Sequence, residues 1–128
     1  MNRNILITGA SGFIGSHVSD FLTKKGFKVI LFDKKLSKYK QKNQKMIIGD
    51  LNNLKDLNKA TKNIHTVFHF AASADLKDSN DKPFDTIENN LMGTVKILKA
   101  SLKNKVKKII FASSIYAISE QGGIYSTS

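Results

Sequence analysis

The amino-acid sequence predicts an α/β fold in which helices cover both faces of a parallel sheet. Short apolar runs rich in Ile, Val and Phe alternate along the chain with segments of helical periodicity, which is typical of βαβ units. The runs are apolar almost throughout, as strands buried on both faces must be. The expected strands are Asn4–Thr8, Lys28–Phe32, Lys45–Ile48, Thr66–Phe70 and Lys108–Ala112.

Three helices are expected between these strands. The first runs from about Phe13 to Lys25 and the second from Leu54 to Lys62, with Asn52 or Asn53 as its N-cap. The third runs from about Phe84 to Lys103 and carries the longest apolar stripe. Its members are Phe84, Ile87, Leu91, Val95, Leu98 and Leu102.

Composition and charge exclude several classes of protein. The chain has 128 residues, enough for one domain, and no cysteine, so disulfides and thiolate metal sites are excluded and a cytoplasmic location is expected. No apolar run approaches the roughly 20 residues of a membrane helix. The net charge is +11, but every basic residue except Arg3 is a lysine and the lysines are scattered. We therefore expect solvated lysine faces, with no nucleic-acid or membrane partner.

The sharpest motif is TGASGFIG, which follows the first expected strand and opens the first expected helix. Gly9 permits a tight turn, Gly12 lets a pyrophosphate approach the backbone, and Gly15 allows the helix to pack closely on the strand. The helix N-terminus adds unpaired N–H groups, those of Phe13 and Ile14 among them. This strand–turn–helix context predicts a dinucleotide site in a Rossmann-type, doubly wound sheet with strand order 3-2-1-4-5.

An acidic residue at the end of the second strand supports the same interpretation. Asp33 can accept hydrogen bonds from both hydroxyls of an adenosine ribose, and its charge would repel a 2′-phosphate. We therefore expect NAD as cofactor and regard NADP as disfavoured. Lys34, expected beside the cofactor, and Lys35 could neutralise a phosphate and so weaken this preference.

Further motifs, taken in order with these, resemble the extended short-chain dehydrogenase/reductases, specifically the NAD-dependent epimerase/dehydratase family that acts on nucleotide sugars. The segment GDL, with Asp50 and Leu51, resembles the pair of residues that the family places beside the adenine ring. The segment HFAA, ending in Phe70, Ala71 and Ala72, resembles the stretch that runs under the cofactor. Its histidine, at position 69, is expected to be structural.

Two more motifs carry the resemblance into the second half of the chain. NNLMGT resembles the family's NNxxGT helix, whose first asparagine, here Asn89, lies near the cofactor. The segment ASS resembles the strand that delivers the catalytic serine, which we assign to Ser114. The resemblance also implies a catalytic tyrosine, which we assign to Tyr125. Tyr116 is the rival, but position 120 is glutamate where a YxxxK motif needs lysine.

The chain ends at the residue before the lysine that would follow Tyr125. A tyrosine pKa near 10 must fall by about three units, or roughly 4 kcal/mol, before the hydroxyl can act as a base near neutral pH. Without that lysine we expect the isolated chain to be inactive. We also expect too few residues for a helical turn, a poorly aimed Tyr125, and Ile109, Ile110 and Phe111 left as an apolar edge that makes the chain marginally stable.

The resemblance therefore implies that residues 1–128 are an NAD-binding domain, incomplete at its C-terminus and without the substrate-binding domain. In the complete enzyme, which is expected to be a homodimer, hydride would pass between a nucleotide sugar and NAD through a keto-sugar. Ile115 and Tyr116 stand where dehydratases of the family carry Asp-Glu, so epimerisation is favoured. The alternative is a non-catalytic NAD-binding module.

Overall fold

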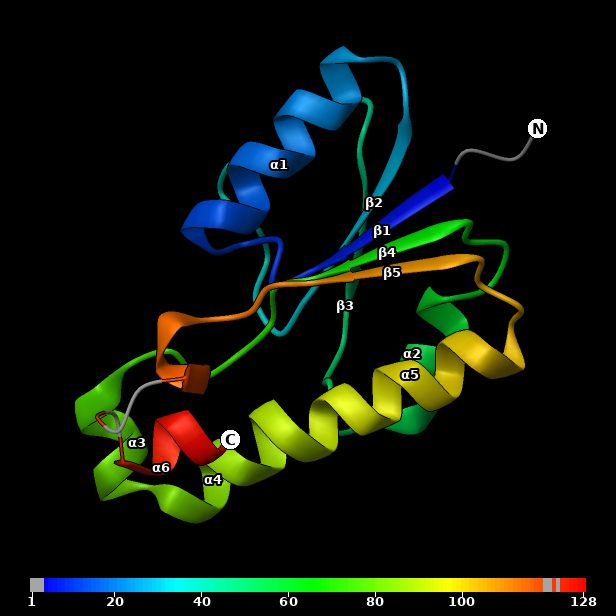
Figure 1. The fold of residues 1–128 in the computed structure, drawn as a ribbon. Coiled ribbons are helices and arrows are strands. Elements are labelled where there is room, and N and C mark those ends of the chain that lie inside the picture. The colour runs from blue at the N-terminus through cyan, green and yellow to red at the C-terminus, as the bar shows by residue number, and fades with distance from the viewer. Residues whose placement is uncertain (1–3, 119–120, 122) are drawn as a thin grey trace.

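A computed structural model describes residues 4–118, 121 and 123–128. Its centre is a single parallel sheet whose strands lie in the order β3-β2-β1-β4-β5 (Figure 1). This order and the five strands confirm the sequence prediction to within one residue at the strand ends. The strands are β1 (Asn4–Thr8), β2 (Lys28–Asp33), β3 (Lys45–Ile48), β4 (Thr66–His69) and β5 (Lys108–Phe111).

The register of the sheet brings the carboxyl ends of its central strands to one edge. Thr8 of β1 lies opposite Phe32 of β2 on one side and His69 of β4 on the other. Since all pairs are parallel, the residues that follow these three strands emerge together. Gly9, Asp33 and the chain after His69 therefore converge, although they are far apart in the sequence.

Helices cover both faces of the sheet (Figure 1). On one face, Val18 and Leu22 of α1 (Phe13–Lys24) pack against a core cluster that includes Ile5 and Ile7. On the other, α2 (Leu54–Ala60) and α5 (Gly93–Lys103) pack against a second cluster. Successive strand residues thus point to opposite layers, as in a doubly wound sheet. Among the described helices, none has the length and apolar character needed to cross a membrane.

The second helix begins at one of its two expected caps. Asn53 Oδ1 accepts hydrogen bonds from the backbone N–H groups of Lys55 and Asp56, at 3.0 and 3.4 Å. These bonds satisfy two of the N–H groups that the first turn leaves without helical partners. Asn52 instead lies in the preceding turn, and its side chain contacts Asn89.

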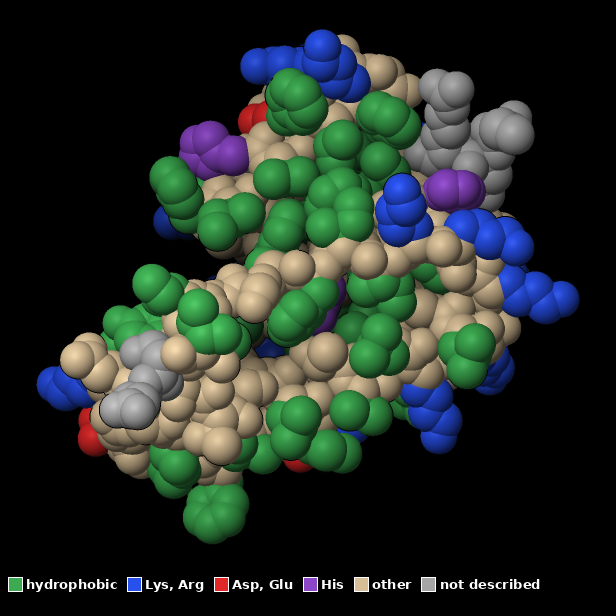
Figure 2. Space-filling model, viewed as in Figure 1, with side chains coloured by type: hydrophobic (Ala, Val, Ile, Leu, Met, Phe, Trp, Pro, Cys, Tyr) green, Lys and Arg blue, Asp and Glu red, His purple; other side chains and the backbone are tan. Residues whose placement is uncertain are grey.

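The third expected helix is a rod of three segments: α4 (Pro83–Ile87), the π-helical turn η1 (Glu88–Met92), and α5. Its apolar stripe does not face the sheet, since Phe84 and Leu102 are 88% and 82% exposed (Figure 2 shows hydrophobic side chains over this rod). Ile97 and Ala100 are fully buried instead. Small residues let the helix approach the sheet closely, whereas a helical period alone cannot say which face does so.

The segment around Tyr125 departs from the prediction of no helical turn, which is wrong. Helix α6 (Gly123–Thr127) packs against α3 (Leu76–Asp81), α4 and the 3₁₀ turn η2 (Ile115–Ile118). A short helix is costly to nucleate in isolation, but these contacts supply the missing stabilisation. Neither α3 nor η2 was expected from the sequence.

The last strand forms the apolar edge that the sequence predicts. β5 pairs with β4 alone within the described sheet. Ile110 and Phe111 are 36% and 58% exposed. The described part of the chain therefore leaves an apolar strand edge in contact with solvent.

The orientation of α5 predicts that truncating two neighbouring residues will change the free energy of unfolding by very different amounts. Ile97→Ala should lower the free energy of unfolding by about 2–5 kcal/mol, because it opens a cavity in the core. Leu98→Ala, in the exposed stripe, should cost less than about 1 kcal/mol. Urea denaturation of both variants measures the two values. Equal losses, or a greater loss for Leu98→Ala, would show that the stripe faces the core.

Candidate functional site

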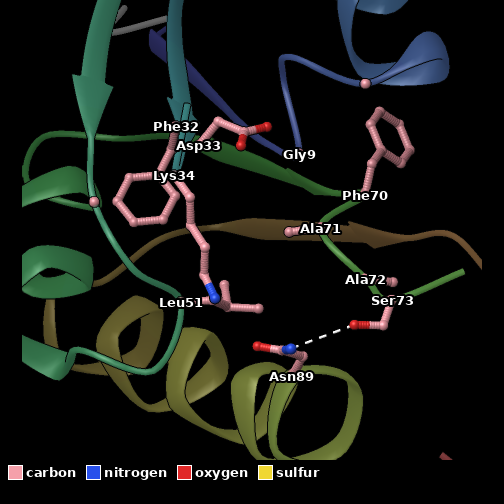
Figure 3. A pocket seen from close by; sticks show the side chains of 12 residues that line it. Gly9, Phe32, Asp33, Lys34, Leu51, Phe70, Ala71, Ala72, Ser73 and Asn89 are labelled. Atoms are coloured by element: carbon pink, nitrogen blue, oxygen red, sulfur yellow. Dashed lines mark hydrogen bonds between the residues drawn. The ribbon is translucent and has the colours of Figure 1, made fainter. Parts of the chain in front are cut away.

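The ends of the central strands frame a cavity of about 280 Å³, which we call the first cavity (Figure 3). It opens at the edge where β1, β2 and β4 end and is closed on one side by the π-helical turn. Its lining residues are Gly9, Gly12, Phe32, Asp33, Lys34, Gly49, Leu51, Phe70, Ala71, Ala72, Ser73 and Asn89.

The glycine loop is shaped by two close approaches of backbone to backbone. Gly9 has a φ of +68°, and a Cβ at this position would lie 2.7 Å from the Ala71 nitrogen. A Cβ at Gly15 would lie 2.2 Å from the Gly9 carbonyl oxygen. Both distances are shorter than any tolerable contact and both partners are backbone atoms, which cannot swing away. Side chains are therefore excluded from both positions.

The N-terminus of α1 is left without a side-chain cap. Gly12 is the N-cap residue, in extended conformation, and its carbonyl accepts the first helical hydrogen bond from the Ser16 N–H at 3.0 Å. The N–H groups of residues 13–15 have no helical acceptor, so this terminus attracts anions. The side chains of Phe13 and Ile14 are 80% and 56% exposed and do not line the cavity. Their predicted contribution can come only from the backbone.

Asp33 lines the first cavity at the end of β2, beside the glycine loop (Figure 3). Its Oδ2 accepts a hydrogen bond from the Ser11 N–H at 3.0 Å, and its Oδ1 accepts one from the Lys35 N–H at 3.3 Å. These bonds fix the carboxylate against the glycine loop. Each oxygen keeps a second lone pair, so the group can still accept hydrogen bonds from the cavity.

Lys34 and Asp50 form an ion pair beside the cavity mouth, with 3.5 Å between Nζ and Oδ1. Both side chains are about half exposed, so the pair adds little to stability. Asp50 does not line the cavity. Its Oδ1 accepts a hydrogen bond from the Asn52 N–H at 2.8 Å, so the Asp50 side chain stabilises the turn after β3 and does not reach into the cavity. That turn holds Leu51, which does line the cavity.

Three lining residues were missed by the sequence analysis: Phe32, Gly49 and Ser73. Phe32 directly precedes Asp33, and a Cβ at Gly49 would lie 2.7 Å from its ring. Position 49 must therefore stay small if β3 is to end beside β2. The place of Phe32 next to a strand-end acid was a usable signal, whereas nothing local marked Ser73.

Asn89 enters the first cavity from the π-helical turn (Figure 3). Its Nδ2 donates a hydrogen bond to Ser73 Oγ at 3.3 Å, and its Oδ1 accepts one from Asn52 Nδ2 at 3.0 Å. The amide thus bridges the segment after β4 and the turn after β3. π-Helical turns are frequent at functional sites, and this one lies at the cavity wall.

A second cavity, of about 250 Å³, adjoins the first. Ser114 and Tyr125 both line it, and so does Tyr116, whose ring meets that of Tyr125 edge-on with centroids 5.7 Å apart. The structure therefore gathers the predicted catalytic pair, but it gathers the rival tyrosine with them. The two cavities share three lining residues, Phe70, Ala71 and Ala72. A ligand in one would thus lie next to a ligand in the other.

His69 links the two central strands to the π-helical turn beneath both cavities. The Ala71 N–H donates to Thr8 Oγ1 at 3.3 Å, so the Thr8 hydroxyl is free to donate to His69 Nδ1 at 2.7 Å. The Thr94 hydroxyl donates to the Asn90 carbonyl and must accept from His69 Nε2 at 3.1 Å. His69 is therefore a neutral Nε2–H tautomer. The expected structural role is supported by its burial and by these two bonds.

Burial lowers the pKa of His69 from 6.5 to about 4. Between these values the unfolded chain binds a proton that the folded chain does not, so the free energy of unfolding should fall as the pH drops. The fall should reach about 3 kcal/mol at most. In His69→Gln this part of the fall should disappear, as urea denaturation from pH 7 to pH 5 measures. His17→Gln, on the exposed side of α1, is the control, and equal slopes in all three proteins would contradict the assignment.

Comparison with known proteins gives the same site a family context. The chain is 38% identical over 120 residues to a UDP-N-acetyl-alpha-D-glucosaminuronate decarboxylase of Bacillus cytotoxicus, covering 89% of this chain and 37% of that protein. It is 37% identical over 119 residues to a UDP-glucose 4-epimerase of Halalkalibacterium halodurans, covering 86% of this chain and 34% of that protein.

A solved structure shows the same fold. MoeE5, in complex with UDP-glucose and NAD, superimposes with a TM-score of 0.84 and 32% sequence identity, over 94% of this chain and 39% of that one. The chain thus spans between 34% and 39% of the length of these three proteins. Residues 5–127 match the NAD dependent epimerase/dehydratase family, and together with the five-stranded sheet and its glycine loop this places the chain in that family.

Proposed function

We propose that the chain binds NAD in the first cavity and is the cofactor-binding portion of an enzyme that modifies nucleotide sugars. One observation carries this proposal. The uncapped N-terminus of α1 and the Asp33 carboxylate both adjoin the glycine loop at one cavity, and side chains are excluded from that loop at Gly9 and Gly15. A dinucleotide offers a pyrophosphate and a ribose diol to these two features.

The donor set fits the parts of a dinucleotide in order along the cavity. Backbone N–H groups at Phe13 and Ile14 would hold the pyrophosphate. Gly12, whose own N–H donates to the Gly9 carbonyl, would let the pyrophosphate approach the backbone, and Gly15 would let α1 approach. Asp33 would accept the ribose hydroxyls. The remaining predicted residues divide into those that line the cavity directly and Asp50, which would act through the turn that it stabilises. The former are Lys34, Leu51, Phe70, Ala71, Ala72 and Asn89.

The second cavity would take the sugar. MoeE5 has been solved with UDP-glucose and NAD together, and here the two cavities share a wall, which supports adjacent binding of substrate and cofactor. NAD, when bound, supplies a reversible hydride acceptor. Tyr125 would take the proton of the reacting sugar hydroxyl, and Ser114 would hydrogen-bond the same oxygen. Relatives include both an epimerase and a decarboxylase, and epimerisation is the reaction we favour.

The same proposal covers the domain organisation, cellular location and oligomeric state of the complete enzyme. Residues 1–128 would form the NAD-binding domain, and the substrate-binding domain would lie outside them, in keeping with the 34–37% of its curated relatives that the chain spans. The complete enzyme would be a cytoplasmic homodimer without a nucleic-acid partner. The absence of a clustered basic stripe among the lysines supports the last point.

Cofactor choice should depend on the Asp33 charge. Asp33→Asn should raise the Kd for NAD by about tenfold or more, because a charge-assisted hydrogen bond is worth about 1.5–3 kcal/mol, and should narrow the preference over NADP. Isothermal titration with both dinucleotides measures this. Asp85→Asn, the same change of charge on α4 away from the cavity, should leave both Kd values unchanged. If wild type binds NADP as tightly as NAD, the role of Asp33 is refuted.

The two tyrosines of the second cavity make a matched pair. In the complete enzyme, Tyr125→Phe should reduce turnover of UDP-sugars by about 100-fold or more, because the proton acceptor is lost. Tyr116→Phe removes a hydroxyl from the neighbouring ring and should cost far less. Reversal of this order would make Tyr116 the base. Turnover unaffected by either change would refute the role assigned to Tyr125, whereas NAD binding without turnover in wild type would favour a non-catalytic NAD-binding module.

A further inference from the structure

The second asparagine of the π-helical turn makes more hydrogen bonds than the first. Asn90 Oδ1 accepts from the Ser73 N–H at 2.7 Å, and Asn90 Nδ2 donates to the Ser73 carbonyl at 3.1 Å. The amide side chain therefore pairs with both backbone groups of one residue, as a neighbouring strand would. Asn90 is only 9% exposed, so these bonds are shielded from water.

The same amide reaches the helix that carries Tyr125. Asn90 Nδ2 donates a second hydrogen bond to Ser128 Oγ at 2.9 Å, and Ser128 Oγ donates to the Tyr125 carbonyl at 3.0 Å. One side chain thus joins a lining residue of the first cavity, Ser73, to a lining residue of the second, Ser128.

The geometry of the π-helical turn explains why Asn90 lies between the two cavities. Asn89 and Asn90 are consecutive, yet Asn89 lines the first cavity and Asn90 the second. Both lie in the π-helical turn Glu88–Met92. The Asn90 carbonyl also accepts the Thr94 hydroxyl, which in turn accepts from His69. The position of Asn90 is therefore fixed from its backbone as well as from its side chain.

We propose that Asn90 is a positioning residue, which fixes Ser73, in the wall of the first cavity, relative to the helix that carries Tyr125. Its effect on NAD and on the sugar rests on the function proposed above. The junction itself is a property of the described chain and does not depend on any ligand. Asn90 lines the second cavity, but its side-chain hydrogen bonds go to Ser73 and Ser128, and its positioning role acts through these two residues.

Hydrogen exchange of the ligand-free chain tests the junction directly. Asn90→Ala should speed exchange of the Ser73 amide, whose acceptor it removes, by about tenfold or more. It should also speed exchange of the Ser128 amide, which follows α6 and donates to the Ile124 carbonyl within that helix. Asn104→Ala is the matched control. Asn104, just after α5, also donates two side-chain hydrogen bonds, to Asn58 and Thr61, far along the rod from both cavities. The Asn104→Ala substitution should leave the exchange rate of the Ser73 amide unchanged.

A second variant separates the Asn90 bonds to Ser73 from the bond to Ser128, and it tests the proposal even if Asn90→Ala does not fold. Ser128→Ala keeps the pairing with Ser73 and should speed exchange in α6 alone. The proposal is overturned if Ser73 exchange in Asn90→Ala matches wild type, if Asn104→Ala speeds it equally, or if Ser128→Ala leaves α6 unchanged. If Asn90 only stabilised the fold as a whole, its loss would speed exchange throughout the chain rather than at these amides.

NAD titration then distinguishes this proposal from the function on which it rests. Asn90→Ala should raise the Kd for NAD by about threefold to tenfold, since Ser73 and its neighbours line the first cavity, and Asn104→Ala should not. If wild type fails to bind NAD while the exchange pattern holds, the proposed function fails and the positioning role stands. Equal NAD affinity in wild type and Asn90→Ala would overturn the positioning of the cavity wall.

Discussion

The rest of the structure depends on the space between the Gly9 carbonyl and residue 15. A side chain at position 15 would begin 2.2 Å from that oxygen, so α1 can start directly beneath the end of β1 only with glycine there. Gly9 is held from the other side by the backbone of Ala71, 2.7 Å from where its own Cβ would be. Strand, turn, helix and the segment after β4 are thus locked together by backbone contacts, and the unpaired N–H groups of α1 are carried to the cavity.

Side-chain hydrogen bonds connect the same strands to the helical segments on the other side of the sheet. The residue before the glycine loop, Thr8, donates to His69, and His69 donates to Thr94 on the rod. Because Thr94 and Asn90 are bonded, the chain of hydrogen bonds runs from β1 to Asn90, which lines the second cavity, and on to Ser73, which lines the first. Protonation of His69 would leave two donors facing each other at Thr8, which agrees with a pKa lowered to about 4 by burial. His69 is therefore uncharged at neutral pH beneath the site.

The sequence was sufficient for the features that local patterns determine. Apolar runs located the strands, the glycine spacing located the turn, and Asp33 followed from the end of β2. Features set by tertiary packing were not accessible. The helical period predicted a stripe through Leu98 but not that Ile97 would face the sheet. No local signal marked the π-helical turn in which Asn89 lines one cavity and Asn90 the other. The helical turn at Tyr125 was missed because its stabilisation comes from α3, α4 and η2 rather than from its own residues.

Gly12 offers the most direct test of the central claim, because it alone of the three loop glycines has room for a methyl group. Its Cβ would lie 3.3 Å from the Gly9 oxygen, a contact that a small shift relieves, and its φ of −81° suits any residue. The account predicts that Gly12→Ala keeps the unfolding free energy within about 1 kcal/mol of wild type while the Kd for NAD rises by about tenfold or more. A folded Gly12→Ala chain that binds NAD as tightly as wild type would contradict it.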